Sequence, residues 1–164
     1  MSTTPHVSSK LLLSDVTVGD EVPALDVDVS TTTIVLGALA SRDWRPMHHD
    51  RTFAQERNGT RDIFMNAPHQ ATYFERYLTD WSGPHGRLGR MKFRILASVF
   101  PGDTMTFRGV VDGVSTDDAG CGWADLTVTL TVGDTTVSEC SARIALPVDA
   151  TDNPWDRHNE DWKP

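Results

Sequence analysis

The stretch SRDWRPMHHD, residues 41–50, holds the side chains of this sequence that are best suited to acid–base chemistry. Asp43 stands five positions before the first of two adjacent histidines, His48 and His49, and Asp50 follows them directly. A carboxylate and an imidazole that share one water molecule can supply two proton transfers without a metal or a covalent intermediate. The stretch therefore has three interpretations: an acid–base dyad, a metal site, or a polar loop in which Asp43 only caps a turn.

The metal interpretation is disfavoured by the direction of neighbouring side chains. His48 and His49 point to opposite sides of an extended chain and diverge by about 100° in a helix. A metal site needs three or more ligands that converge at about 2 Å. Neither an HExxH motif nor a Cys/His spacing is present, so His69 could complete such a site only from elsewhere in the fold.

One long helix is predicted directly after this region, over residues 67–81. Asn66 can cap its start, Pro68 lies in its first turn, and Gly83 with Pro84 ends it. An apolar stripe steps along it by four and three residues: Ala67, Ala71, Phe74, Leu78 and Trp81. Because such a face must be buried, this is the expected core helix.

The remaining chain reads as a shorter helix and several half-buried strands. The shorter helix starts among residues 31–33, and the segment from about Arg42 to Arg61 is expected to be irregular. Alternating apolar and polar residues predict strands in four runs: residues 23–30, 90–99, 105–111 and 124–132. This order predicts an α+β domain in which an antiparallel sheet wraps a single helix.

The two cysteines are predicted to be free thiols. The sequence WADLTVTLTVGDTTVSECSARIAL favours a hairpin that turns at Gly133 and Asp134. Cys140 then lies opposite Thr127 or Val128, about 20 Å along the strand from Cys121. A disulfide needs Cα atoms within about 7 Å, so we expect no bridge, which suits a reducing compartment.

The composition argues against nucleic-acid and membrane partners. The formal net charge is −8 and the pI is about 5.1, so no basic field is available to hold a phosphate backbone. The longest apolar runs, such as residues 34–40, are too short to span a bilayer. The first residues lack the basic start and long apolar centre of a secretory signal, and a cytoplasmic location is expected.

Several of these stretches resemble one known family. ALASRDWRPMHHDRTFA resembles the Asp-x-Asn-Pro-x-His signature of the MaoC-like, (R)-specific enoyl-CoA hydratases, and FPGDTMTFRGVV resembles the hairpin that follows their core helix. SRDWRPMHHDR, RDIFMN and RYLTDWSGP are similar to the small MaoC-like subunits of actinobacterial steroid side-chain degradation. The similarity covers roughly residues 20–146.

The resemblance implies the hot-dog fold, in which a curved antiparallel sheet wraps around one long central helix. It divides the chain into an N-terminal extension over residues 1–14, a MaoC-like hot-dog domain over residues 15–146, and an acidic C-terminal tail over residues 147–164. The tail holds Trp155 and Trp162 and is expected to be either flexible or a strap on a partner subunit.

The resemblance also implies roles for the residues of the opening stretch. Hydrating an α,β-unsaturated thioester needs a water deprotonated near C3, a proton delivered to C2, and donors at the thioester oxygen. Asp43 and His48 would hold that water as the catalytic pair. The backbone N–H of Asn66, where the family usually has Gly, would meet the oxyanion at the helix start. Spacing and resemblance together favour this over the polar loop, while the choice of base and acid stays open.

Two sets of basic residues are candidates for substrate binding. Arg45 stands where the family has Asn, and its guanidinium cannot accept a hydrogen bond, so it either binds phosphate or points outward. Arg90, Lys92 and Arg94, together with Arg87, form a local positive cluster that could meet the phosphates of coenzyme A. The alternative for this cluster is a solvated strand face.

These features predict an enoyl-CoA hydratase that adds water to a 2-enoyl-CoA with a bulky acyl chain, such as a steroid-derived one. No metal and no separate cofactor are expected, because coenzyme A is part of the substrate. The alternatives are an acyl-CoA thioesterase of the same fold and a non-catalytic acyl-CoA-binding subunit. The expected assembly is a homodimer or a hetero-oligomer with a second MaoC-like subunit.

Overall fold

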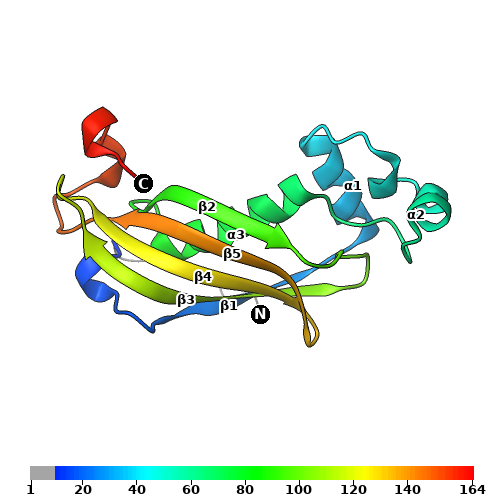
Figure 1. Cartoon of the computed structure of the whole chain (residues 1–164), viewed down its shortest axis with the longest axis horizontal. Helices are drawn as coiled ribbons and strands as arrows, with labels where there is room; N and C mark the ends of the chain where they lie inside the picture. The colour runs from blue at the N-terminus through cyan, green and yellow to red at the C-terminus, as the bar shows by residue number, and fades with distance from the viewer. Residues whose placement is uncertain (1–9) are drawn as a thin grey trace, which may run out of the picture.

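In the computed structural model, which describes residues 10–164, five antiparallel strands form one curved sheet in the order β1-β3-β4-β5-β2 (Figure 1). The strands are β1 (Glu21–Asp28), β2 (Arg87–Ile95), β3 (Thr104–Thr116), β4 (Gly122–Val132) and β5 (Thr135–Leu146). Of the predicted N-terminal extension, residues 1–9 lie outside the described residues. Leu13–Asp15 forms a short 3-10 turn.

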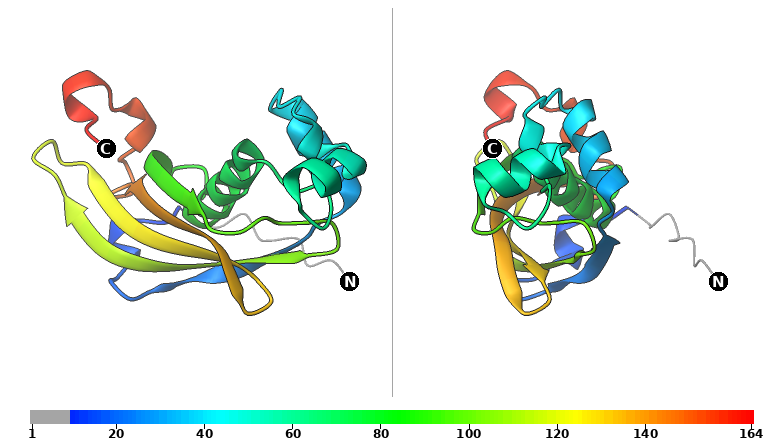
Figure 2. Two further views of the ribbon diagram at one scale, coloured as in Figure 1. Left: turned by 45° about the vertical axis from the view of Figure 1, so that its right-hand side comes forward. Right: turned by 90° about the vertical axis from the view of Figure 1, so that its right-hand side faces the viewer.

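Helix α3 (Ala67–Ser82) lies along the concave side of the sheet, as both views of Figure 2 show. Phe74 and Leu78 on its apolar stripe are fully buried. Helices α1 (Thr31–Ala40) and α2 (Arg51–Asn58) lie together at one end of the molecule. The predicted α+β arrangement, a curved sheet around one central helix, is confirmed. Among residues 10–164, no helix is both long and apolar enough to cross a bilayer.

The β4–β5 hairpin has the register expected from the sequence. Val132 pairs with Thr135 across the Gly133–Asp134 turn, and Val128 pairs with Cys140. Gly133 takes a φ of 55°, the left-handed region that glycine adopts without strain. Cys121 and Cys140 are both free, as predicted, and both are buried.

The segment between α1 and α3 is more regular than the sequence suggests. Pro46–His48 forms a 3-10 turn, and α2 follows where an irregular segment was expected. Asp50 caps α2 through its side chain, which accepts from the backbone N–H of Phe53, and Gly59 ends it at a φ of 66°. The helix is strongly polar and buries only Ala54, so no apolar stripe marks it.

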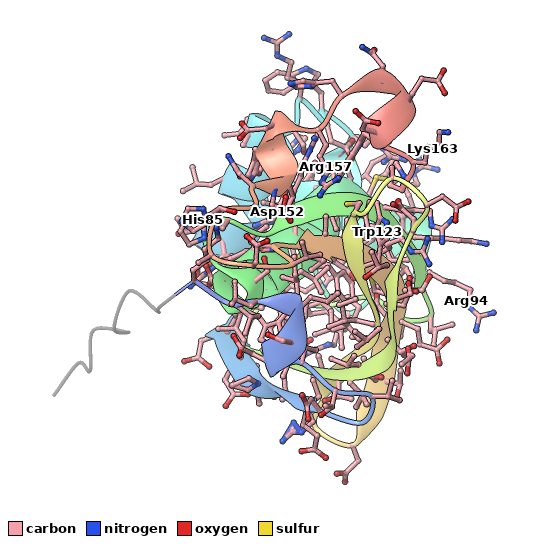
Figure 3. The ribbon with its side chains drawn as sticks, turned by 90° about the vertical axis from the view of Figure 1, so that its left-hand side faces the viewer. His85, Arg94, Trp123, Asp152, Arg157 and Lys163 are labelled. Carbon is pink, nitrogen blue, oxygen red and sulfur yellow. The ribbon has the colours of Figure 1, made fainter. Side chains whose placement is uncertain are left out.

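The C-terminal tail packs against this chain's own sheet. Trp162 contacts Trp123 with a ring-centroid distance of 5.1 Å, and the guanidinium of Arg87 lies 3.7 Å from the centre of the Trp162 ring. Figure 3 faces this end of the molecule and shows the tail above the end of the sheet that holds Trp123. In this structure the tail thus packs on its own chain, where the sequence predicted a flexible tail or a strap on a partner subunit; the strap stays a prediction.

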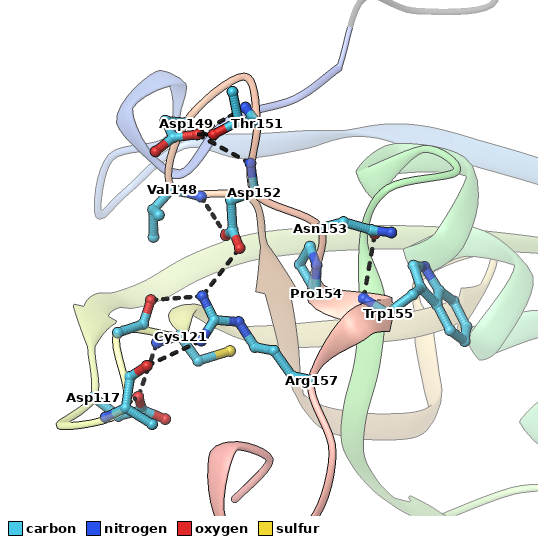
Figure 4. A network of polar contacts seen from close by, with 12 residues as sticks. Asp117, Cys121, Val148, Asp149, Thr151, Asp152, Asn153, Pro154, Trp155 and Arg157 are labelled. Carbon is cyan, nitrogen blue, oxygen red and sulfur yellow. Dashed lines mark hydrogen bonds and ion pairs between the residues drawn. The ribbon is translucent and has the colours of Figure 1, made fainter.

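Arg157 anchors the tail to the β3–β4 connection. Its guanidinium donates to the carbonyl oxygens of Ala119 and Gly120, each at 3.0 Å, and to Asp152 at 3.0 Å (Figure 4). The Asp152 carboxylate accepts in turn from the backbone N–H of Val148. These bonds join the tail to the opposite end of the sheet from α1 and α2.

Candidate active site

Asp43 is placed by the turn that ends α1. Its backbone N–H donates to the carbonyl oxygen of Ala38 at 2.9 Å, and Arg42 before it takes a φ of 55°. A positive φ is unusual for a residue with a side chain, so the chain reverses sharply here. The Asp43 side chain is only 10% exposed and faces the start of α3.

His48 is buried beside Asp43, on the 3-10 turn that follows. Its Nε2 atom lies 3.4 Å from Oδ2 of Asp43. Its Nδ1 atom lies 2.7 Å from the carbonyl oxygen of Phe64, and the two rings meet edge to face at 5.1 Å. The two predicted dyad residues are therefore brought together, while His49 is exposed.

Asn66 joins this pair to both helices. Its Oδ1 atom accepts from the backbone N–H of His69 and caps α3, as predicted. Its Nδ2 atom donates to Oδ2 of Asp43 at 3.1 Å and to Oγ of Ser41 at 2.8 Å. The sequence indicated a helix cap and a backbone role for Asn66 but not this contact with Asp43, which depends on how α1 packs against α3. The backbone N–H of Asn66 has no backbone acceptor among residues 10–164.

Arg45 binds Asp43 and so does not simply point outward. Its Nε donates to Oδ1 at 2.8 Å and its Nη2 donates to Oδ2 at 2.9 Å. Hydrogen bonds from Arg45 hold the pKa of Asp43 well below its ordinary value of 3.8, with a further contribution from Asn66, against the opposing effect of burial. Asp43 is consequently an ionised carboxylate near neutral pH.

A groove of about 480 Å³ opens beside these residues, between α1 and α3. It is lined mainly by small or apolar side chains and includes Ser41, which binds Asn66. Its lining residues are Thr33, Leu36, Gly37, Ala40, Ser41, Pro68, His69 and Thr72. This groove therefore lies on the α1 side of Asp43 and His48, with Ser41 as the link to Asn66.

A larger groove, of about 980 Å³, lies between β1 and the C-terminal end of α3. The charged side chains that line it, Arg76 and Asp80, pair with each other at 3.3 Å. The hydroxyl of Tyr77, a further lining residue, donates to the backbone of Val22. This groove therefore lies at the opposite end of α3 from Asn66, Asp43 and His48.

The predicted positive cluster lies on the edge strand β2. Arg90, Lys92 and Arg94 are exposed and alternate with the partly buried Met91 and Phe93. Arg94 pairs with Glu139 on β5 at 3.1 Å. None of the three contacts Asp43 or His48 in the described part of the chain, and their role in binding phosphate stays a prediction.

Residues 10–164 hold no group of three or more His, Cys, Asp or Glu side chains placed to bind a metal ion. His69 does not join His48 and His49; its ring stacks on Tyr73 with a centroid distance of 4.9 Å. The site is thus a carboxylate, an imidazole and an amide at a helix N-terminus beside a groove.

Residues 15–132 match the family described as MaoC like domain. The chain belongs to this family. A relative from Mycobacterium tuberculosis, the 3-oxo-4,17-pregnadiene-20-carboxyl-CoA hydratase beta subunit, is 38% identical over 98 residues. The matched region covers 60% of this chain and 75% of the relative. The resemblance seen in the sequence, both to MaoC-like proteins and to a steroid side-chain hydratase subunit, is confirmed.

Solved structures share the fold. The ChsH1-ChsH2 complex from M. tuberculosis contains a chain that superposes with a TM-score of 0.71 at 28% identity, covering 79% of this chain and 98% of that one. The (R)-hydratase from A. caviae involved in PHA biosynthesis superposes with a TM-score of 0.70 at 22% identity, covering 80% and 98%. The hot-dog fold expected from the sequence is therefore confirmed.

Proposed function

We propose that this chain is the water-adding subunit of an enoyl-CoA hydratase. The observation that carries the proposal is the pairing of Asp43 Oδ2 with His48 Nε2, 3.4 Å apart, at the N-terminus of the core helix. A group that can take a proton from water and return it to C2, beside a helix start that can donate to the thioester oxygen, matches what the addition of water to an unsaturated thioester requires.

The groups divide the reaction between them. A water held at His48, beside the Asp43 carboxylate, would add to C3 of the enoyl thioester, and a proton would reach C2. As the thioester oxygen gains negative charge, the backbone N–H of Asn66 at the start of α3 would donate to it, helped by the helix dipole. The product is a 3-hydroxyacyl-CoA.

The substrate and partner are proposed from the relatives. The M. tuberculosis relative is named as the beta subunit of a hydratase of a pregnadiene carboxyl-CoA, which favours a bulky steroid-derived acyl-CoA here. The similar chain in the ChsH1-ChsH2 complex belongs to a structure of two different proteins. We therefore favour a hetero-oligomer with a second MaoC-like chain over a homodimer. The basic residues on β2 remain candidates for the coenzyme A phosphates.

The test is a hydration assay on the purified chain, alone and with a co-expressed MaoC-like partner, using short and steroidal enoyl-CoAs. Loss of the absorbance of the conjugated thioester supports a hydratase, and activity only with the partner supports the hetero-oligomer. Release of free coenzyme A thiol would show a thioesterase instead. Binding of acyl-CoA without any turnover, even with the partner, would show a non-catalytic subunit.

A further inference from the structure

The carboxylate of Asp43 is surrounded by four N–H donors. Arg45 supplies three of them: its Nε and, at the longer distance of 3.4 Å, its backbone N–H donate to Oδ1, and its Nη2 donates to Oδ2. The Nδ2 atom of Asn66 supplies the fourth and donates to Oδ2. A carboxylate offers about four lone-pair sites. The accepting capacity of Asp43 is therefore taken up before any water arrives.

His48 has the opposite arrangement. A backbone carbonyl oxygen can only accept a hydrogen bond, so Nδ1 of His48 must donate its N–H to Phe64 at 2.7 Å. In the neutral ring the lone pair then lies on Nε2, the atom that faces Asp43. Because the Asp43 oxygens already accept N–H donors, this nitrogen is the proton acceptor of the pair.

We propose that Arg45 is a positioning residue that takes Asp43 out of proton transfer and leaves His48 as the single proton carrier. The proposal rests on the proposed hydratase function and goes beyond it, because it assigns the base and the acid to one side chain. Arg45 stands where the family has Asn. Its planar guanidinium donates two parallel hydrogen bonds, one to each carboxylate oxygen of Asp43, which the amide of Asn cannot do.

The proton balance closes with His48 alone. Neutral Nε2 takes one proton from water while the hydroxide oxygen bonds to C3, and the C2–C3 π electrons move to the thioester as an enolate. The same Nε2 then returns that proton to C2, which restores neutral His48. One H and one OH are thereby added across the double bond, and no oxidant or reductant is consumed.

Asp43 acts in this scheme as a fixed negative charge. It lies 3.4 Å from Nε2, and its charge stabilises the positive ring that exists between the two proton transfers. Among residues 10–164, the charged or titratable groups that touch it are Arg45 from the same loop and His48 from the following turn. From α3 comes the neutral amide of Asn66, which also binds the neutral hydroxyl of Ser41 at the end of α1.

The first test needs no turnover. Carbon-13 NMR of labelled aspartate would follow the Asp43 carboxyl through a pH titration in the wild-type chain, with Asp43→Asn used to assign its signal. In Arg45→Gln two side-chain donors are lost, and we expect the midpoint of Asp43 to rise towards its ordinary value of 3.8. Arg76→Gln, which breaks the exposed Arg76–Asp80 pair on α3, is the matched control and should leave that midpoint unchanged.

The second test is the pH dependence of hydration. We expect Arg45→Gln to lower kcat by between about 10-fold and about 100-fold through misplacement of Asp43, with a smaller change in KM. Arg45→Lys keeps the charge without the two-point grip and should recover only part of this loss. In Asp43→Asn the rate should fall, but the decline of the rate on the acidic side of the pH profile (the acidic limb) should remain, because His48 and not Asp43 accepts the proton from water.

Two results would overturn the role given to Arg45 while the hydratase function stands. One is an unchanged titration midpoint of the Asp43 carboxyl in Arg45→Gln, and the other is loss of the acidic limb of the hydration pH profile in Asp43→Asn. A wild-type chain that hydrates no enoyl-CoA, alone or with its partner, overturns the proposed function and the assignment of His48 with it. A raised midpoint together with a retained limb supports the inference.

Discussion

Gly37 on α1 faces the imidazole ring of His69 on α3 so closely that a methyl group at position 37 would overlap the ring. The Nδ1 atom of His69 is buried and has no hydrogen-bond partner within the described residues. Burial lowers the pKa of His69, which favours its neutral form. This contact sets the distance between the two helices that line the groove beside Asp43.

Gly37→Ala should therefore destabilise the protein, although alanine normally favours a helix over glycine. Overlap with the His69 ring must push α1 and α3 apart, and we expect a cost of about 1–3 kcal/mol in urea unfolding. His69→Ala removes the obstacle, so Gly37→Ala should cost much less in that background. A single variant that is as stable as the wild type would contradict the contact.

The tail should contribute measurably to stability through Trp162. Its ring is partly buried against Trp123 and under Arg87. We expect Trp162→Ala to lower the free energy of unfolding by roughly 1–2 kcal/mol, since much of a large apolar side chain is returned to water. Trp44→Ala is the control, because Trp44 is 65% exposed and its loss should change stability by no more than about 0.5 kcal/mol. Equal effects of the two substitutions would show that the tail is loose in solution.

The cysteines should be inert in the folded protein. Burial raises the pKa of the Cys121 thiol to about 11 and that of Cys140 to about 11, so very little thiolate forms near neutral pH. An aromatic disulfide reagent that releases a coloured thiolate should react with neither cysteine in native buffer and with both in denaturant. Rapid labelling of the native chain would place one of these thiols at the surface.

The central part of the fold could be predicted because its signals are local and periodic. The stripe of α3 repeats at helical spacing between a capping Asn66 and Gly83, and the structure ends the helix where those residues stand. The β4–β5 turn is likewise set by Gly133 and Asp134, from which the pairing of Val128 with Cys140 follows. In each case one short stretch of sequence determines the outcome.

The site and the tail depend on contacts that no periodicity encodes. Asn66 reaches Asp43 across 23 positions only because α1 packs on α3. Arg45 and Asp43 are only two residues apart in sequence, yet their ion pair depends on the left-handed backbone conformation of Arg42, which precedes Asp43. The tail packs through Trp162 on Trp123 of β4. The alternation of side chains along β4 places Trp123 on the face of the sheet opposite to the core. Type and spacing therefore indicated the chemistry, whereas tertiary packing set its geometry.

Asp43 should make stability depend on pH in one direction. Its pKa is lowered in the folded protein, chiefly by Arg45, so the favourable contribution of the ionised group is present above the unfolded value of 3.8 and is lost as pH falls below it. The difference in unfolding free energy between wild type and Asp43→Asn should thus be larger at about pH 7 than at about pH 3. In the Arg45→Gln background this pH dependence should shrink. A difference that grows as pH falls would reverse the sign and exclude a lowered pKa.

The sharpest consequence for activity concerns His48 and its neighbour in sequence. His48→Gln keeps a polar group but removes the proton carrier, and turnover should fall by at least about 10²-fold while acyl-CoA binding is retained. Asp43→Asn should also lose activity steeply, because the charge beside Nε2 disappears. The double variant should be little worse than the poorer single one, because the Asp43 charge acts through the His48 ring and groups that work as a unit are not additive. His49→Gln is the matched control: His49 is exposed, and its substitution should leave most hydration intact. The measurement is the steady-state rate of hydration of an enoyl-CoA by each variant. Near-normal turnover by His48→Gln, or a loss of turnover confined to His49→Gln, would show that residues 41–50 form only a polar loop.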